Sequence, residues 1–190
     1  MLAPVCSQPR LRNAAATRQA MLESARRQFA RESYENVGLR EIAGAVGVDP
    51  ALVCRYFGSK EALFREVLPH PDDGEFLEGM TAEALPAYLA ELLSVPECEV
   101  SAEKAEWLLI VMRSAGSPQA SKIVREILHE GVLAPVEKML DAKDAELRAA
   151  LVLAVMIGSA VLNTMGIETL SDGNSRVREK LAELFAAAIR

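Results

Sequence analysis

Aromatic residues, cysteines and histidines are all scarce in this chain of 190 residues. Phe, Trp and Tyr make up 5% of it, and it has three cysteines and two histidines. The cysteines Cys6, Cys54 and Cys98 are odd in number and widely spaced, with no CxxC pair, which argues against a secreted fold held by disulfides. Residues 1–12 contain no apolar segment typical of a signal peptide. We therefore expect a cytoplasmic protein.

Motifs that carry catalytic or metal chemistry are also missing. No Ser/His/Asp or Cys/His arrangement has a recognisable local spacing, and the glycines do not form a phosphate-binding loop. His70 has Asp72 and Asp73 beside it, but a single loop makes a poor metal site, and a surface turn is the better interpretation. We expect no enzyme activity, no cofactor and no metal.

Long hydrophobic runs are limited to one, residues 149–162, AALVLAVMIGSAVL. A membrane span needs roughly 20 apolar residues. This run has 14, and it is rich in Ala, Gly and Ser. We interpret it as a helix buried on most sides, with a partner subunit over one face, and expect no membrane contact. A membrane-anchored protein in which 149–167 inserts is the alternative.

Charge is distributed unevenly along the chain. The net charge is −6, yet residues 1–68 carry ten basic and seven acidic side chains, so this part has a net charge of +3 and the remainder −9. An acidic protein can bind nucleic acid when its basic charge is segregated. An excess of three charges is modest, and by itself it argues little.

Helical periodicity runs through nearly the whole chain, and strand patterns are almost absent, so we expect an all-α fold of about nine helices. Leu22, Ala25 and Phe29 form the apolar stripe of a first helix, Thr17 to about Glu32, that follows a flexible arm, 1–16. Pro69 to Gly74 indicates a boundary, which separates a domain at 17–68 from another at 69–190. The later helices are expected near 81–94, 102–115, 118–140 (bent at Gly131 and Pro135), 144–166 and 174–189.

Residues 38–57, GLREIAGAVGVDPALVCRYF, carry the clearest signal. A helix from about Leu39 to Val46, the turn Gly47-Val48-Asp49 and a helix starting at Pro50 are typical of a helix-turn-helix. Gly47 permits a left-handed turn, Asp49 can cap the second helix, and Pro50 suits its first position. Gly58 ends that helix, and Ser59 caps a fourth helix that begins at Lys60. A small core is expected from the apolar residues Ile42, Val46, Val48, Val53 and Phe57.

Burial of Val53 and Phe57 would direct Leu52, Arg55 and Tyr56 outward, so that the second helix could enter a major groove. Arg55 could bond guanine O6 and N7, and Leu52 could contact a thymine methyl. Lys60, at a helix N-terminus, could bind phosphate. The alternative is an αα-hairpin in a packed bundle. The DNA contacts expected on this ground are Leu52, Arg55, Tyr56 and Lys60.

Residues 17–64 resemble the N-terminal domain of TetR-type transcriptional regulators, in register and without gaps. The matching positions are Thr17-Arg18, Ala25, Phe29, Tyr34, Leu39, Ile42-Ala43, Gly47-Val48, Pro50, Phe57, Lys60 and Leu63. The family usually has Thr or Ser where this chain has Gly38, Gly where it has Ser33, and often Tyr where it has Cys54. A weaker resemblance extends over Arg148 to Glu168.

The resemblance implies a three-helix DNA-binding domain followed by a helical domain that binds a small-molecule effector and forms a homodimer. It implies a repressor that leaves a palindromic operator in double-stranded DNA when the effector, bound among helices 81–165, moves the helix at 59–68. Arg10, Arg12 and Arg18 would add phosphate or minor-groove contacts from the N-terminal arm. The resemblance also implies DNA contacts at Gly38, Leu39, Arg40, Gly47, Pro50, Ala51 and Cys54. The expected dimer contacts are Ala154, Gly158 and Leu184; the candidate effector contacts, each of which could instead be core, are Tyr88, Trp107, Met112, Met156 and Asn163.

Two other interpretations stay open at this point. A helical ligand-binding or scaffold dimer could keep this fold with a weakened DNA-reading head, and Gly38 and Cys54 are the reasons to consider it. Cys54 could also act as a redox switch, although only Arg55 nearby would lower its pKa.

Overall fold

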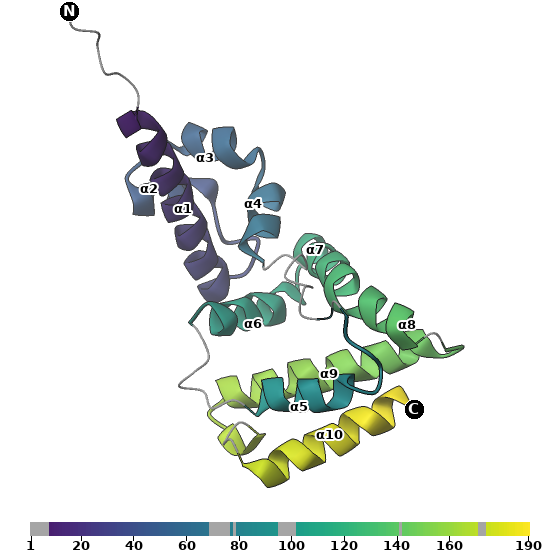
Figure 1. The fold of residues 1–190 in the computed structure, drawn as a ribbon. Helices are drawn as coiled ribbons and strands as arrows, with labels where there is room; N and C mark the ends of the chain where they lie inside the picture. Colours follow the sequence, from purple (N-terminus) through teal and green to yellow (C-terminus); the bar gives the residue numbers. More distant parts are fainter. Residues whose placement is uncertain (1–7, 69–76, 78, 95–101, 141, 171–173) are drawn as a thin grey trace, which may run out of the picture. The chain divides into compact units, whose positions relative to one another are not determined.

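The structure, a computed structural model, describes residues 8–68, 77, 79–94, 102–140, 142–170 and 174–190. Within these ranges all regular structure is helical, as the sequence predicts (Figure 1). The chain forms two compact units. The first comprises residues 1–68 and 109–123, and the second comprises residues 69–108 and 124–190. The predicted loop at Pro69 to Gly74 lies outside the described residues.

The first unit is built on one long helix, α1 (Gln8–Arg31), with three short helices beside it: α2 (Leu39–Val46), α3 (Pro50–Phe57) and α4 (Lys60–Val67). The end of α6 (Ala102–Ser114) and the start of α7 (Pro118–Leu128) complete it. Helix α1 begins at Gln8 rather than Thr17, so residues 8–16, expected in a flexible arm, are helical.

The core of the first unit lies under α1. Met21, Ala25 and Phe29 are buried there at i, i+4, i+8, whereas Leu22, expected in the core, is half-buried. Phe64 packs edge-on against Phe29 and Tyr34, at ring-centroid distances of 4.8 and 5.0 Å. Such aromatic pairs add to the stability that burial provides.

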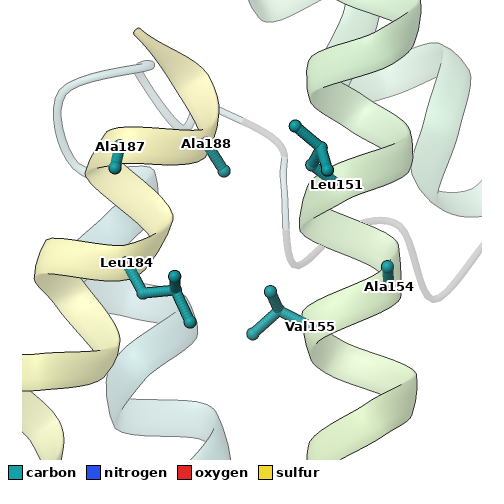
Figure 2. A pocket seen from close by; sticks show the side chains of 6 residues that line it. All are labelled: Leu151, Ala154, Val155, Leu184, Ala187 and Ala188. Carbon is teal, nitrogen blue, oxygen red and sulfur yellow. The ribbon is translucent and has the colours of Figure 1, made fainter.

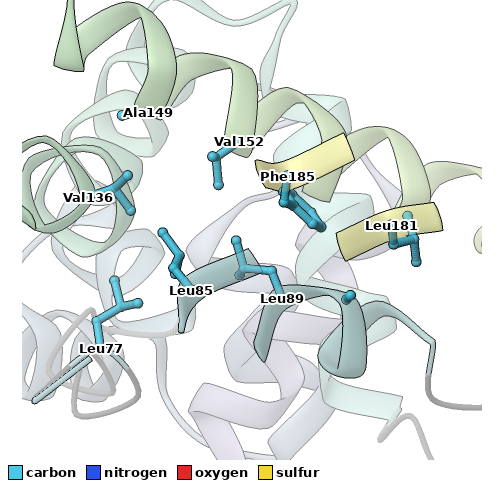
Figure 3. Close-up of a cluster of buried hydrophobic side chains, with 9 residues drawn as sticks. Leu77, Leu85, Leu89, Val136, Ala149, Val152, Leu181 and Phe185 are labelled. Carbon is cyan, nitrogen blue, oxygen red and sulfur yellow. The ribbon is translucent and has the colours of Figure 1, made fainter. Parts of the chain in front are cut away.

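The second unit packs α5 (Leu85–Leu93), α8 (Ala134–Leu140), α9 (Ala145–Thr164) and α10 (Ser175–Ile189) around one apolar cluster (Figure 3). Helix α5 begins at Leu85 instead of near 81, because Pro86 has no N–H to donate and so belongs in a first turn. The members of the cluster are Leu77, Leu85, Leu89, Ala90, Val136, Ala149, Val152, Leu181 and Phe185.

The predicted bend in residues 118–140 is a π-helical turn, His129–Leu133, between α7 and α8. The Ala134 N–H donates to the His129 carbonyl, a step of five residues. Pro135 has no N–H and its ring would collide with the carbonyl four residues earlier in a regular helix. The wider π-helical turn accommodates Pro135, so α7 and α8 follow each other without an intervening loop.

The predicted apolar helix is α9, and one of its sides is exposed in the single chain. Ala149, Val152 and Ser159 are buried, whereas Leu147 and Leu151 are 61% and 46% exposed. Among the described residues, α9 is the one helix long and apolar enough to cross a membrane, a criterion that the core helix of a globular protein can also meet.

The segment 109–123 is anchored to the first unit by polar contacts. The Arg113 Nε donates to the Ala30 carbonyl at 2.9 Å, in the last turn of α1. A hydrogen bond from Ser117 lowers the pKa of Glu35 in the loop that follows. The positive charge of Arg113, bonded to an end carbonyl, also complements the negative C-terminal end of the α1 dipole.

We predict that Arg113→Ala lowers the free energy of unfolding by about 1 kcal/mol, because it leaves a carbonyl of α1 without its charge-assisted bond. Urea unfolding of the full chain measures this. Lys122→Ala, which removes a positive charge from an exposed position of the same segment, is the control and should change stability by less than about 0.5 kcal/mol. Equal effects of the two substitutions would contradict the assignment.

Candidate DNA-binding site

The turn between α2 and α3 is fixed by backbone hydrogen bonds. Gly47 adopts φ 76° and ψ 33°, a left-handed conformation that suits glycine. The Gly47 N–H donates to the Gly44 carbonyl at 3.2 Å, and the Val48 N–H donates to the Ala43 carbonyl at 3.0 Å. These two bonds form a Schellman motif, which satisfies the end carbonyls of α2 and reverses the chain.

The side chains after the turn cap the next two helices as the sequence predicts. Asp49 accepts from the Ala51 N–H at 2.8 Å, and Pro50 occupies the first turn of α3. Gly58, at φ 79°, ends α3, and Ser59 accepts from the Ala62 N–H at 3.1 Å at the start of α4. The helix-turn-helix therefore has the local contacts that define its geometry.

The inner face of this motif is only partly the predicted one. Ile42, Val53 and Phe57 are buried, but Val46 and Val48 are half-buried. The two valines flank the exposed Gly47 at the turn, where fewer residues surround them. The buried set is still sufficient to orient α3, because Val53 and Phe57 lie on one face at i, i+4.

Five of the predicted DNA contacts are exposed on the outer face of the motif. Ala51, Cys54 and Arg55 on α3 are exposed, and so are Arg40 on α2 and Gly47 in the turn. The remaining predicted contacts of the motif are half-buried: Gly38, Leu39, Pro50, Leu52 and Tyr56. A basic side chain thus lies on each helix of the motif, with small and apolar side chains between them.

Gly38 occupies the N-cap position of α2 without a side-chain cap. The Glu41 carboxylate lies over it, in the place that a Cβ at position 38 would take. A Thr or Ser at position 38 would displace the Glu41 side chain. Glycine has no Cβ and leaves that place to Glu41, although the resemblance predicts a hydroxyl-bearing residue here.

Lys60 is held at the start of α4 by the loop after α1. Its ammonium lies 4.4 Å from the centre of the Tyr34 ring, and Nζ donates to the Glu35 carbonyl at 3.5 Å. Burial lowers the pKa of Lys60, and the negative charges of Glu35 and Glu61 oppose that shift. Burial and the charge of Glu61 raise the pKa of Tyr34 to about 12. An ammonium has three donors, so Lys60 keeps donors for a phosphate.

Arg18 is placed differently from the other predicted contacts. Its guanidinium pairs with the Glu66 carboxylate on α4 and lies 4.9 Å from the centre of the Phe57 ring. The partner Glu66 could not be predicted from the sequence, because residues 48 positions apart share no local pattern. The side chains of Arg10 and Arg12 lie outside the described residues.

The five candidate effector residues do not all fall in one unit. Tyr88 and Met156 pack against the apolar cluster of the second unit. Trp107 and Asn163 belong to the same unit, and their Nε1 and Oδ1 atoms are buried with no hydrogen-bond partner in the part of the chain that the structure describes. Met112 belongs to the first unit and is 45% exposed.

The predicted dimer contacts Ala154 and Leu184 line an apolar groove of about 470 Å³ between α9 and α10 (Figure 2). Leu151, Val155, Ala187 and Ala188 complete its walls. Leu184 is 49% exposed, and Gly158 is exposed on the same helix as Ala154. The groove and the exposed leucines of α9 form an apolar surface that the single chain leaves open to water.

The glycines of α2 provide a matched test of the turn. We predict that Gly47→Ala lowers the free energy of unfolding by about 1–2 kcal/mol, because its left-handed φ strains any residue with a Cβ. Gly44→Ala, inside α2, should instead raise it by about 0.5–1 kcal/mol. A Cβ meets nothing within 4 Å at either position, so the backbone alone decides the sign. Urea unfolding of both variants measures it, and two changes of the same sign would contradict the assigned geometry.

Two family models match the chain in succession. Residues 21–67 match the description "Bacterial regulatory proteins, tetR family", and residues 98–190 match "Tetracyclin repressor-like, C-terminal domain". Solved structures share the fold. The alignment with NalD of Pseudomonas aeruginosa, at 17% identity and a TM-score of 0.71, covers 93% of this chain and 97% of the NalD chain. Salmonella enterica GusR, at 20% identity and a TM-score of 0.70, covers 92% and 95%.

Sequence relatives agree with both models. The HTH-type transcriptional repressor AcnR of Corynebacterium efficiens is 32% identical over 94 residues, 50% of this chain. AcnR of Corynebacterium glutamicum is 28% identical over 119 residues, 62% of this chain. The chain spans about half the length of these relatives, 46% and 60% respectively. With the motif, the fold and both models in agreement, the chain belongs to the TetR family of bacterial regulatory proteins.

Proposed function

We propose that this protein is a sequence-specific DNA-binding transcriptional repressor that acts as a homodimer and responds to a small-molecule effector. The observation that carries the proposal is the helix-turn-helix: a hydrogen-bonded turn, a capped α3 anchored by Val53 and Phe57, and Arg55 exposed on its outer face. DNA is the partner, so the cytoplasm is the proposed location.

In this function α3 enters the major groove and its exposed side chains read bases. Arg55 donates to guanine O6 and N7, and Leu52 contacts a thymine methyl. Arg40 and Lys60 bind phosphates on either side, and the backbone near Gly38 and Gly47 approaches the strand. Ala51 and Cys54 leave room for base edges. The intact turn and the exposed Arg55 favour this function over a scaffold protein with a weakened DNA-reading head.

The dimer proposal is supported by the apolar surface of α9 and α10. A second copy would cover the groove beside Ala154 and Leu184, and Gly158 would permit close approach of helices. A twofold dimer places two recognition helices about 34 Å apart, in successive major grooves of a palindromic operator. The small side chains of this surface also suit burial against a second copy better than insertion into a membrane.

The effector proposal is supported by polar atoms buried in the second unit. The Trp107 Nε1 donor and the Asn163 Oδ1 acceptor have no partner among the described residues, and a buried polar group without one destabilises a protein. A ligand with a hydrogen-bond acceptor and a donor on an apolar frame would satisfy them, and Tyr88 and Met156 lie along the apolar cluster of that unit. Such a ligand releases DNA if it prefers the conformation that does not bind DNA.

The DNA-binding function is tested by selecting bound sites from random duplexes with the purified full chain. We expect an enriched palindrome. Arg55→Ala should then cost roughly 1–3 kcal/mol of binding free energy and relax the preference at one base pair in each half-site. Arg125→Ala, at an exposed position of the second unit, is the control and should bind like the wild type. Absence of enrichment from a folded protein, with no ligand detected in it by mass spectrometry, would reject the proposal.

The dimer interface is tested by charge substitution. Leu184→Asp should produce a monomer in sedimentation equilibrium, because an unpaired carboxylate in an apolar interface costs several kcal/mol. Leu92→Asp, at a leucine of similar exposure on α5 that does not line the groove, should leave the assembly unchanged. A Leu184→Asp protein that sediments like the wild type would place the interface elsewhere.

A further inference from the structure

Arg18 contacts two helices at once from its place on α1. Its Nη2 lies in an ion pair with Oε2 of Glu66, in the last turn of α4, and its Cζ is 4.9 Å from the ring centre of Phe57, the last residue of α3. Phe57 is 6% exposed, whereas the Arg18 and Glu66 side chains are 39% and 36% exposed. One guanidinium therefore joins the C-terminal ends of both helices to α1.

Each contact has a physical reason to stabilise the arrangement. A guanidinium over an aromatic face is attracted to the ring quadrupole. A carboxylate near a helix C-terminus is disfavoured by the helix dipole, and a cation beside Glu66 offsets that. Helices α3 and α4 have eight residues each, too few for stability in isolation, so tertiary contacts of this kind decide where they lie.

The same contacts make Arg18 a poor phosphate ligand. Its charge is balanced by Glu66 within the first unit, so a phosphate would have to compete with a carboxylate already in place. Arg40 and Arg55 are exposed, and neither has an ion-pair partner among the residues that the structure describes. We propose that Arg18 is a positioning residue that fixes the recognition helix from behind through Phe57 and Glu66, rather than a DNA contact.

This inference rests on the proposed DNA-binding function, and substitution of Glu66 tests it by sign. If Arg18 positions α3, Glu66→Gln weakens its hold and lowers affinity for the selected duplex by about two- to fivefold. If Arg18 binds phosphate, Glu66→Gln frees it and raises affinity. Glu32→Gln removes an acidic charge from an exposed position of the same unit and gives the electrostatic baseline. Affinity of Glu66→Gln equal to or above that of Glu32→Gln overturns the proposal.

The salt dependence of Arg18 variants gives a second readout. Arg18→Ala should weaken binding by about three- to tenfold, with an unchanged slope of log K against log salt. Loss of a phosphate contact would reduce that slope by about one, as expected for Arg40→Ala, and would overturn the proposal. If Arg18→Ala does not fold, Arg18→Gln is measured instead: it removes the charge and keeps most of the side chain, so an unchanged slope supports positioning and a slope reduced by about one rejects it. A wild-type chain that selects no site rejects the DNA-binding function itself, whatever the variants do.

Discussion

The shortness of α2, α3 and α4 is the constraint on which the first unit depends. Each has eight residues, and a helix of that length in water is unstable without partners. Their positions come from what they bury against α1 and from how their ends are satisfied. Burial of Ile42, Val53 and Leu63 supplies most of the favourable free energy of packing these helices, since removal of apolar area from water is the largest favourable contribution to folding. The caps and the left-handed Gly47 then select one arrangement among those that bury the same surface.

Much of this unit could be predicted from local sequence. The bounds of α2 and α3 and the caps at Asp49 and Ser59 follow from residues within a few positions of one another, because helix starts and stops are local events. The family match rests on the same local residues. The predicted start of α1 at Thr17 was wrong: the helix begins at Gln8, and Pro9 lies in its first turn, where a proline is favoured.

Contacts between distant residues could not be predicted in the same way. Arg18 with Glu66 and Arg113 with the Ala30 carbonyl join positions 48 and 83 residues apart, and one sequence contains no periodicity at such separations. An exposed arginine in a DNA-binding motif is readily interpreted as a phosphate ligand, because its partner is invisible until the helices are in place. The candidate effector residues had the same difficulty: Met112 is on the same helix as Trp107, yet the two belong to different units.

Segment 109–123 determines which residues a fragment or a chimera with this DNA-binding unit must contain. The first unit consists of two stretches of chain, and α6 and α7 each contribute residues to both units. A fragment that ends at residue 68 lacks the guanidinium that caps α1 and the serine that bonds Glu35. Transfer of this DNA-binding unit to another regulator of the family therefore requires two segments of chain. The end of α6 and the start of α7 must be transferred together with α1 to α4.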